Sequence, residues 1–400
     1  MDTTRRVFLT TASGLVVGAR IASASAQGAN TRVRVGIIGT GGRARGLMQH
    51  LKRLDGVEIV AVCDVFEQRL LQAAEIAGPS ALKLDDYRRI LDNKEIDGVL
   101  IGAPDHWHKT MTLDAVAAGK DVYCEKPVSH TIEEGAEMVK VIEASKQVVQ
   151  TGTQQRSWEH YLQGKEMVQS GKLGQITFVQ SYWYQHSRPG DWPAAQPAGL
   201  DWKRWLGPAK DQPFRPERLY QWRHFWDFGG GQLTDLMTHW IDVVHWYMNV
   251  DAPLSAYSLG HNYNLKMWEA PDTVSTTIEF PTFTCAHLGT YVSKVDDGGL
   301  EFRGELGTLK IDRARLAFYK DDAPYAKGTL TPEPEILIQS KADGSIAHLQ
   351  NWIDCVRSRQ KPNAHIRVAH QAARTSHIAN ASLKARKPVR WNRAQERIET

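Results

Sequence analysis

From residue 32 onward, short apolar runs alternate with segments in which apolar residues recur at helical spacing. Helical patterns such as Phe66–Ala77, Thr110–Ala118 and Ile132–Ser145 separate runs rich in Val and Ile. The five runs that predict strands are Val33–Gly39, Val57–Asp64, Ile96–Ala103, Asp121–Cys124 and Val148–Thr151. Because strands that alternate with helices form parallel sheets covered on both faces, residues 32–151 are predicted to form a doubly wound Rossmann domain.

Beyond residue 151 the pattern changes to alternating strands separated by turn residues and by long stretches rich in Pro and Gly. The predicted strands include Asp272–Phe280, Ala286–Val292, Gly307–Ile311 and Arg315–Phe318. Aromatic rings gather earlier, at Trp183, Trp192, Trp202, Trp205, Trp222 and Trp226. Such rings either stack on the apolar faces of a sugar or pin loops to the body of the protein. We expect residues 152–391 to form a second, substrate-binding α/β domain.

The first 26 residues have the pattern of an export signal. Arg5 and Arg6 precede a mildly apolar run that ends in Ala24-Ser25-Ala26, which is typical of a twin-arginine signal with its cleavage site. We therefore expect residues 1–26 to be removed and the protein to be periplasmic or otherwise exported after folding. The apolar run is too short to span a bilayer, so no membrane association is expected after removal.

The composition excludes some partners and some chemistries. Loss of residues 1–26 removes three Arg and one Asp from 49 basic and 45 acidic residues, which leaves a net charge of +2. That balance gives no reason to expect nucleic acid as a partner. The cysteines are too scattered for a disulfide framework or a metal-binding pair, and they are Cys63, Cys124, Cys285 and Cys355.

The first strand-to-helix turn reads GTGGRA and fits the dinucleotide-binding pattern G-x-G-x-x-G/A. Gly39 permits the tight turn, and Gly41 lets the backbone approach a pyrophosphate. The small side chain of Ala44 lets the helix pack closely on the strand, while the helix N-terminus faces the phosphates. The sequence therefore predicts a dinucleotide site at this turn.

The second predicted strand ends at Asp64, which lies 20 residues after Ala44. An acidic residue at this spacing accepts hydrogen bonds from the adenosine ribose and repels a 2′-phosphate, so NAD is favoured over NADP. Arg43 lies in the turn itself and keeps NADP open as the alternative.

Two polar segments follow the third and fourth predicted strands, Ala103–His108 (APDHWH) and Tyr123–Pro127 (YCEKP). Open α/β sheets bind their ligands at these carboxyl ends. Pro127 holds the residues before it in an extended turn, where Lys126 can reach the nicotinamide end of the cofactor and a substrate hydroxyl. The alternative is a Glu–Lys pair on the surface, which contributes little energetically.

The run GGGQLTDLMTH places Asp235 four residues before His239, so both are predicted on one face of a helix, with Asp242 and Trp246 continuing the stripe. An imidazole near neutral pKa is a suitable general base for a sugar hydroxyl, which Asp235 can orient. Asp and His residues of this helix also raise the alternative of a metal site. His245 points away from the stripe and one helix does not converge on an ion, so no metal is expected.

These motifs together resemble the Gfo/Idh/MocA oxidoreductase family. Glu125-Lys126-Pro127 matches the Glu-Lys-Pro triplet of that family, and Ala103–His108 is similar to its Thr-Pro-Asn-x-x-His segment, with Ala for Thr and Asp for Asn. Gly231, Asp235 and His239 are similar to its Gly-x-x-x-Asp-x-x-x-His motif. The similarity extends over nearly all of the mature chain, including 351–358 and 387–391.

The resemblance implies a second domain with a large, mostly antiparallel sheet, often used for subunit contacts, and hence a homo-oligomer. It also implies the roles of the site residues. We predict catalytic roles for Lys126, His239 and Asp235. We expect substrate contacts from Trp107, Tyr220, Arg223 and His224. The expected cofactor contacts are Gly39, Gly41, Gly42, Arg43, Ala44, Asp64, Pro104, His108, Glu125 and Lys126.

The function hypothesis is NAD(P)-dependent oxidation of a carbohydrate CH–OH group by hydride transfer. Because free NAD is cytoplasmic, an exported enzyme has to carry its cofactor with it, and oxidation and reduction then have to balance within the cycle. Two exported types that the chain resembles satisfy this, a two-substrate oxidoreductase of the glucose–fructose type and an NAD-dependent glycosidase. Leu200–Pro208 is similar to exported members without choosing between them. A non-catalytic sugar-binding protein is the third hypothesis.

Overall fold

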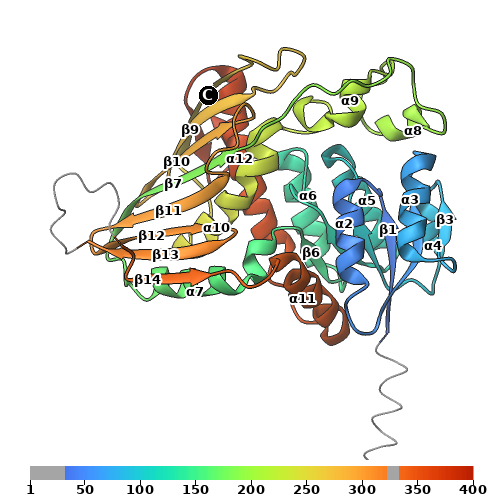
Figure 1. The fold of residues 1–400 in the computed structure, drawn as a ribbon, viewed down its shortest axis with the longest axis horizontal. Coiled ribbons are helices and arrows are strands. Elements are labelled where there is room, and N and C mark those ends of the chain that lie inside the picture. Colours follow the sequence, from blue (N-terminus) through green and yellow to red (C-terminus); the bar gives the residue numbers. More distant parts are fainter. Residues whose placement is uncertain (1–31, 322–332, 400) are drawn as a thin grey trace, which may run out of the picture.

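The computed structural model describes residues 32–321 and 333–399, which form two sheets with helices packed around them (Figure 1). The predicted export signal of residues 1–26 lies outside the described residues. In the described part of the chain all four cysteines are free and buried. No helix of residues 32–321 and 333–399 is both long and apolar enough to cross a bilayer.

The first sheet is parallel and has six strands among the described residues, in the order β3-β2-β1-β4-β5-β6. Its strands are β1 (Val33–Ile38), β2 (Val57–Cys63), β3 (Leu82–Leu84), β4 (Gly98–Ile101), β5 (Asp121–Cys124) and β6 (Val149–Thr151). Its helices are α2 (Gly42–Leu51), α3 (Glu67–Ala77), α4 (Arg88–Asp92), α5 (Asp105–Ala117) and α6 (Ile132–Glu143). The doubly wound Rossmann prediction is confirmed, and the strand order reverses between β1 and β4.

Most of these strands are buried on both faces, as their continuous apolar runs predict. All four residues of β4 and of β5 are buried, and so are five of the six residues of β1. The short strand β3 escapes sequence prediction because its LKL sequence buries a single residue. The first helical turn of α5, which begins at Asp105, was also missed, because a helix had been predicted only from Thr110.

The second sheet has ten strands among the described residues, in the order β14-β13-β12-β11-β7-β10-β9-β8-β15-β16. All printed pairs in it are antiparallel except β10 with β7. The predicted, mostly antiparallel sheet is therefore confirmed. Its strands are β7 (Ile176–Tyr184), β8 (Ser255–His261), β9 (Thr273–Glu279), β10 (Thr284–Thr290), β11 (Gly298–Gly304), β12 (Gly307–Asp312), β13 (Arg315–Lys320), β14 (Ile336–Gln339), β15 (Val389–Asn392) and β16 (Arg397–Glu399).

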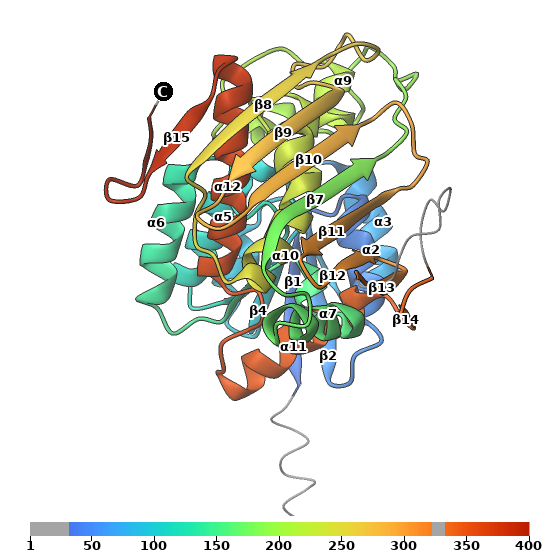
Figure 2. The same ribbon diagram turned by 90° about the vertical axis from the view of Figure 1, so that its left-hand side faces the viewer.

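Helices α7 (Glu159–Gln169), α10 (Thr238–Met248) and α12 (Ile366–Ala385) cover one face of the second sheet, and its other face is open (Figure 2). The open face alternates with the buried one along each strand, as in β9, where every second residue is buried. Helix α12 also packs on α6, and α11 (Gly344–Ser358) packs on α2 and β1. The two C-terminal helices thus join the two sheets.

A segment that we call the crossing arm (residues 185–228) leaves the end of β7 and passes over the first sheet (Figure 1). It contains α8 (Trp202–Leu206), α9 (Pro216–Tyr220) and a 3₁₀ turn at Trp222–His224. Backbone hydrogen bonds tie it down, with Asp201 N donating to Val65 O at 2.9 Å and Glu67 N donating to Gly199 O at 2.9 Å. Two of the arm's five tryptophans anchor it, since Trp202 and Trp205 stack on each other at 4.7 Å in the core.

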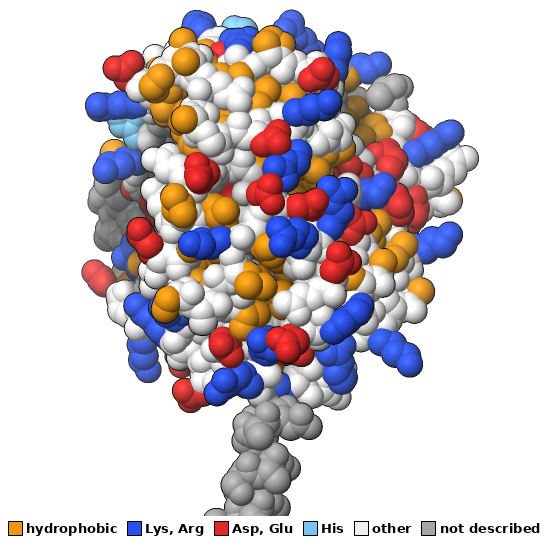
Figure 3. All heavy atoms as spheres, turned by 90° about the vertical axis from the view of Figure 1, so that its right-hand side faces the viewer, with side chains coloured by type: hydrophobic (Ala, Val, Ile, Leu, Met, Phe, Trp, Pro, Cys, Tyr) orange, Lys and Arg blue, Asp and Glu red, His pale blue; other side chains and the backbone are white. Residues whose placement is uncertain are grey.

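The face of the molecule on the side of the first sheet carries Lys and Arg interspersed with Asp and Glu (Figure 3). The two signs alternate over this face, without the single-sign basic stripe that marks a nucleic-acid footprint. Positive and negative side chains are therefore mixed over this face, in keeping with the near-neutral net charge of the sequence.

Candidate functional site

A cavity of about 630 Å³ lies between the carboxyl ends of β1, β2 and β4 and the crossing arm. Gly39, Gly41 and Gly42 line it from the first strand-to-helix turn. Other lining residues come from the strand ends and from the arm, and they include Asp64, Pro104, Trp107, Lys203, Arg204, Tyr220 and Arg223. This is the edge of the sheet where the strand order reverses, which is where doubly wound sheets bind ligands.

The backbone of the glycine turn fits a dinucleotide. Gly39 has φ +77°, and a Cβ there would lie 2.6 Å from Ala103 N, so only glycine is accommodated. Above Gly41 and Gly42 an added Cβ would meet nothing within 4 Å, so their N–H groups are open to an incoming pyrophosphate. Ala44 is fully buried against Gly102. A Cβ added at Gly102 would lie 2.7 Å from the Cβ of Ala44.

Asp64 lines the cavity but is already used by the protein. Its Oδ2 accepts hydrogen bonds from Thr40 N at 2.7 Å and Thr40 Oγ1 at 2.9 Å, and its Oδ1 accepts one from Phe66 N at 2.9 Å. One lone pair of Oδ1 therefore remains for a ribose hydroxyl. Arg45 and Arg69 line the same cavity, so cations that could meet a 2′-phosphate are also present.

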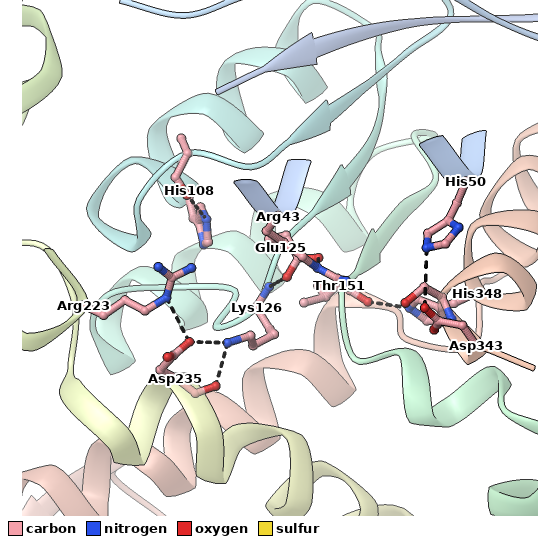
Figure 4. A network of polar contacts seen from close by, with 12 residues as sticks. Arg43, His50, His108, Glu125, Lys126, Thr151, Arg223, Asp235, Asp343 and His348 are labelled. Carbon is pink, nitrogen blue, oxygen red and sulfur yellow. Dashed lines mark hydrogen bonds and ion pairs between the residues drawn. The ribbon is translucent and has the colours of Figure 1, made fainter. Parts of the chain in front are cut away.

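The Arg43 side chain turns towards the end of β5. Its Nε donates to Glu125 Oε1 at 2.8 Å, and Glu125 is 5% exposed (Figure 4). Gly152 makes room for this pair, because a Cβ there would lie 2.8 Å from the Glu125 carboxylate. Arg43 and Glu125 therefore join the glycine turn to the end of β5, and Glu125 faces a cation of the protein.

His108 is placed differently from the expected cofactor contact. Its ring is buried, with Nδ1 2.6 Å from Pro127 O and Nε2 2.9 Å from Ala103 O, and it does not line the cavity. The imidazole thus ties together the ends of β4 and β5 and positions the turn that carries Lys126. Pro104, by contrast, precedes α5 and lines the cavity.

Lys126 meets the second half of the chain beside the cavity. Lys126, Asp235 and His239 are not among the residues that line it, but Arg223 lines it and contacts Asp235. The Nζ of Lys126 donates to Asp235 Oδ1 at 2.5 Å and to Asp235 O at 2.6 Å, while Arg223 Nε donates to the same Oδ1 at 3.2 Å (Figure 4). Burial opposes ionisation of Asp235, but the charges of Lys126 and Arg223 hold the pKa of its carboxyl group well below the usual range. Asp235 is therefore an anion clamped between two cations.

His239 lies beside this cluster and is 5% exposed. Its ring stacks on Trp183 with centroids 5.7 Å apart and an interplanar angle of 28°. Burial lowers the pKa of His239 well below its usual value, and the charges of Lys126, Arg313 and Arg43 lower it further. The imidazole is therefore unprotonated near pH 7 and has a nitrogen that can accept a proton, but its pKa is not near neutral as predicted, so it is a weaker base than expected.

The helix that carries Asp235 and His239 begins differently from the prediction. Leu233–Met237 is a π-helix, and α-helical geometry starts at Thr238. The wider turn changes the angular spacing on which the predicted face depends, and in the described residues no hydrogen bond joins Asp235 to His239. Such π segments are frequent at functional sites, and a sequence period of four does not reveal them.

Asp242, which was predicted to continue the stripe of Asp235 and His239, pairs with a different residue. Asp242 is fully buried and pairs with Arg156, whose Nε donates to both carboxylate oxygens at 2.8 and 2.9 Å. His245 points elsewhere, as predicted, with Nδ1 2.7 Å from Val250 O. Within residues 32–321 and 333–399 no group of three or more His, Cys, Asp or Glu is arranged to hold a metal ion.

The residues predicted to bind substrate lie in different surroundings. Trp107 lines the nucleotide cavity and donates from Nε1 to Trp205 O at 2.9 Å, and Tyr220 lines it from the crossing arm. His224 stacks on Trp268 at 3.5 Å and does not line the cavity; burial lowers its pKa to about 3. Of this set, Arg223 alone contacts a predicted catalytic residue, Asp235.

The sequence reasoning missed two charged residues near this cluster. Asp105 is 3% exposed, and burial raises the pKa of its carboxyl group well above the usual value despite the charges of Lys126 and Arg223. Arg313 lies with its guanidinium 4.6 Å from the centre of the Trp183 ring. Asp105 stands in the APDHWH motif, which signalled a site without assigning it a role. Arg313 lies in a turn between two strands, with no sequence signal.

Two family descriptions match most of the described chain. "Oxidoreductase family, NAD-binding Rossmann fold" (GFO_IDH_MocA) matches residues 33–153, and "GFO/IDH/MocA C-terminal domain" matches residues 161–310. The first of these covers the glycine turn and Lys126, and the second covers Asp235 and His239.

Curated relatives include inositol dehydrogenases and a glycosidase. The chain is 32% identical over 332 residues to inositol 2-dehydrogenase 3 of Saccharopolyspora erythraea, which is 81% of this chain and 85% of that protein. It is 29% identical to inositol 2-dehydrogenase of Salmonella paratyphi B, where the match spans 55% of each chain. It is 33% identical to a glycosyl hydrolase family 109 protein of Solibacter usitatus over 36% of this chain and 37% of that one.

Solved structures share the fold. The WlbA dehydrogenase from Bordetella pertussis, in complex with NADH and UDP-GlcNAcA, superimposes with a TM-score of 0.70 at 20% identity, over 90% of this chain and 99% of that one. Levoglucosan dehydrogenase, in complex with NADH and levoglucosan, gives a TM-score of 0.69 at 19% identity, over 90% and 99% of the chains. At these identities the likeness establishes the fold alone.

Proposed function

Because the chain belongs to the Gfo/Idh/MocA oxidoreductase family, we propose that it oxidises a carbohydrate CH–OH group with a tightly held NAD(P) cofactor. The observation that carries this proposal is the meeting of Lys126 with Asp235 near His239, in contact with Arg223, which lines the dinucleotide cavity. Lys126 follows a strand of the first sheet, whereas the other two belong to the helix packed on the second. The family's motifs therefore converge on one place.

A bound nicotinamide would supply the group that accepts and returns a hydride. The protein's own residues handle the oxygen and the proton. Lys126 donates a hydrogen bond to the substrate hydroxyl oxygen and stabilises the negative charge that develops there. His239, neutral and unprotonated, accepts the hydroxyl proton. Asp235 holds the Lys126 ammonium in place and balances its charge in a buried site.

The crossing arm supports tight retention of the cofactor. It covers the cavity and is held down by Arg204 as well as by backbone bonds, with Arg204 Nη2 2.9 Å from Asp85 Oδ2 and Nη1 donating to Asp85 O at 2.9 Å. Release of a dinucleotide requires these contacts to open. An exported protein with such a closure would carry its cofactor through the twin-arginine route. On the basis of the export signal predicted in residues 1–26, we propose that the mature protein is periplasmic or otherwise exported.

A second candidate function is an NAD-dependent glycoside hydrolase. It is favoured by the similarity to the glycosyl hydrolase family 109 protein. This reaction oxidises a sugar carbon, which acidifies the neighbouring C–H. Loss of that proton expels the aglycone from the next carbon, water adds to the double bond, and the oxidised carbon is reduced again. The reaction needs an additional acid or base. Tyr220 and His224, which were predicted from the sequence to contact the substrate, are two candidates, and the buried carboxyl group of Asp105 is a third.

The purified mature protein is expected to retain a dinucleotide, visible by its absorbance and by mass analysis after denaturation. A sugar that raises absorbance at the reduced-nicotinamide band without cleavage supports the oxidoreductase. Release of nitrophenol from a chromogenic glycoside without added NAD selects the glycosidase instead. Protein that contains no dinucleotide and binds none on addition would refute both enzymes and leave a sugar-binding protein.

We also propose that the mature protein is a homo-oligomer that uses the open face of the second sheet. Leu259 and Leu288 flank Ser275 on neighbouring strands and are 55% and 36% exposed. Large apolar residues on an uncovered sheet face are typical of subunit contacts. The double variant Leu259→Lys/Leu288→Lys should lower the mass measured by light scattering, whereas Leu71→Lys on α3 should not. A wild-type protein that is monomeric at micromolar concentration would contradict this.

A further inference from the structure

Arg313 is a cation of the second sheet that faces the site without a partner among the described residues. It lies in the turn between β12 and β13, and its guanidinium packs over the Trp183 ring at 4.6 Å. Its Nε is fully buried and has no hydrogen-bond partner. No carboxylate of residues 32–321 and 333–399 forms an ion pair with it within 4.0 Å, although Asp297 and Asp343 act on it from farther away.

The position of Arg313 connects it to the catalytic cluster. Trp183, over which it lies, stacks on His239, and the charge of Arg313 contributes to lowering the pKa of His239. Arg43 also lies near enough to act on the Arg313 charge. Arg313 therefore lies on the second-sheet side of the same interface that holds Lys126 and His239.

The other cations of this interface each have a direct carboxylate partner. Arg43 pairs with Glu125, and Asp235 lies between Lys126 and Arg223. The nearest phenol is Tyr161, whose hydroxyl group is buried and has no partner. After these pairings Arg313 remains as a positive charge that no described residue neutralises directly.

The buried Nε of Arg313 lacks a partner, which is costly because burial removes the water that would otherwise accept its hydrogen bond. The cation–π contact of Arg313 with Trp183 returns only part of that cost. A planar fork of N–H donors matches a carboxylate or a phosphate in bidentate geometry. The missing partner is therefore an anionic group, and its place lies near Trp183, the ring on which the proposed general base His239 also stacks.

We propose that Arg313 binds an anionic substituent of the substrate, so that the enzyme acts on an acidic sugar rather than a neutral one. The substituent is a carboxylate, as in a uronic acid, or a phosphate ester. This inference rests on the proposed function, since it names the substrate class of that same site. Arg313 acts as a specificity residue and takes no part in moving the hydride or the proton.

Binding can be measured without turnover. Titration calorimetry on the cofactor-loaded protein would compare methyl glucuronide and methyl galacturonide with the parent methyl glucoside and methyl galactoside. Glucose 6-phosphate and galactose 6-phosphate form a second arm that distinguishes phosphate from carboxylate. We expect one acidic arm to bind at least about tenfold more tightly than the neutral sugars, the usual scale for a charge-assisted hydrogen bond.

Arg313→Met keeps the packing on Trp183 and removes the charge. It should abolish the preference for the acidic sugar, leave the affinity for the neutral parent unchanged, and raise KM with little effect on kcat. Arg315→Met is the matched control. Arg315 is the first residue of β13, two positions after Arg313, and its side chain is 60% exposed and pairs with Asp312. A melting curve establishes that the variants are folded, and Arg313→Lys should recover part of the preference.

Equal binding of acidic and neutral sugars by the wild-type protein would overturn the inference, and so would an acid preference that survives in Arg313→Met. Both results leave the proposed function intact if a neutral sugar reduces the bound cofactor. Conversely, an acidic sugar that binds through Arg313 but never reduces the cofactor would support this residue assignment and refute the proposed oxidation.

Discussion

Lys126→Ala is expected to lower the rate at which a sugar reduces the bound dinucleotide by about 10²–10⁴-fold. The ammonium is 10% exposed and is fixed by the Asp235 carboxylate at 2.5 Å and the Asp235 carbonyl at 2.6 Å. Removal of the side chain takes away the donor to the substrate oxygen. It leaves the glycine turn intact, and that turn provides the phosphate contacts. Turnover should therefore fall far more than the affinity for the cofactor.

The measurement is a single-turnover rate combined with a fluorescence titration of NADH. Lys109→Ala is a suitable control, since Lys109 lies on α5 of the same sheet, is 30% exposed and pairs with Glu137 at 2.6 Å. An alanine variant at 126 with wild-type turnover would remove this lysine from the mechanism. A loss of cofactor affinity as large as the loss of turnover would give it a binding role instead.

Acidification from pH 7.5 to pH 5 is expected to lower the free energy of unfolding steeply. Burial lowers the pKa values of several histidines, to about 3 for His106, His224 and His287 and to about 4 for His245 and His348. In the unfolded chain each titrates near pH 6.5. The unfolded state therefore binds more protons below that pH, and stability that is present above pH 6.5 is lost on the way to pH 4.

Each of these histidines contributes up to about 1.4 kcal/mol per pH unit in that range, and the five together contribute up to about 7 kcal/mol per pH unit. This slope is large compared with a typical total stability of about 5–15 kcal/mol. Urea unfolding curves at intervals of half a pH unit would measure it. Stability that stays constant between pH 7.5 and pH 5 would show that these rings are protonated in the folded protein.

His287→Asn isolates one contributor. This ring is fully buried, with Nδ1 2.9 Å from Ser181 Oγ, and an amide can occupy that position without binding a proton. The variant should show a pH slope smaller by about 1.4 kcal/mol per pH unit. His261→Asn, at an exposed position on β8, should leave the slope unchanged.

The amino-acid sequence by itself determined five of the six strands of the first sheet and their parallel arrangement. Continuous Val and Ile runs such as Val33–Ile38 are buried on both faces, and a parallel sheet is the arrangement that permits this. The glycine turn was equally local, because Gly39 adopts a positive φ and packs against Ala103. These features depend on residues close in the chain, or on a pairing that the βαβ topology imposes, so the pattern alone is sufficient.

The three-dimensional contacts decided which residues share a site. Asp242 and Asp235 stand on one predicted stripe, yet Asp242 pairs with Arg156 and Asp235 with Lys126, because a π turn rotates the helix between them. His108 joins the ends of two strands, and Arg313 packs on Trp183 from a turn that carries no sequence motif. Partners more than a hundred residues apart are selected by how two sheets pack together, and hydrophobic periodicity carries no information about that packing.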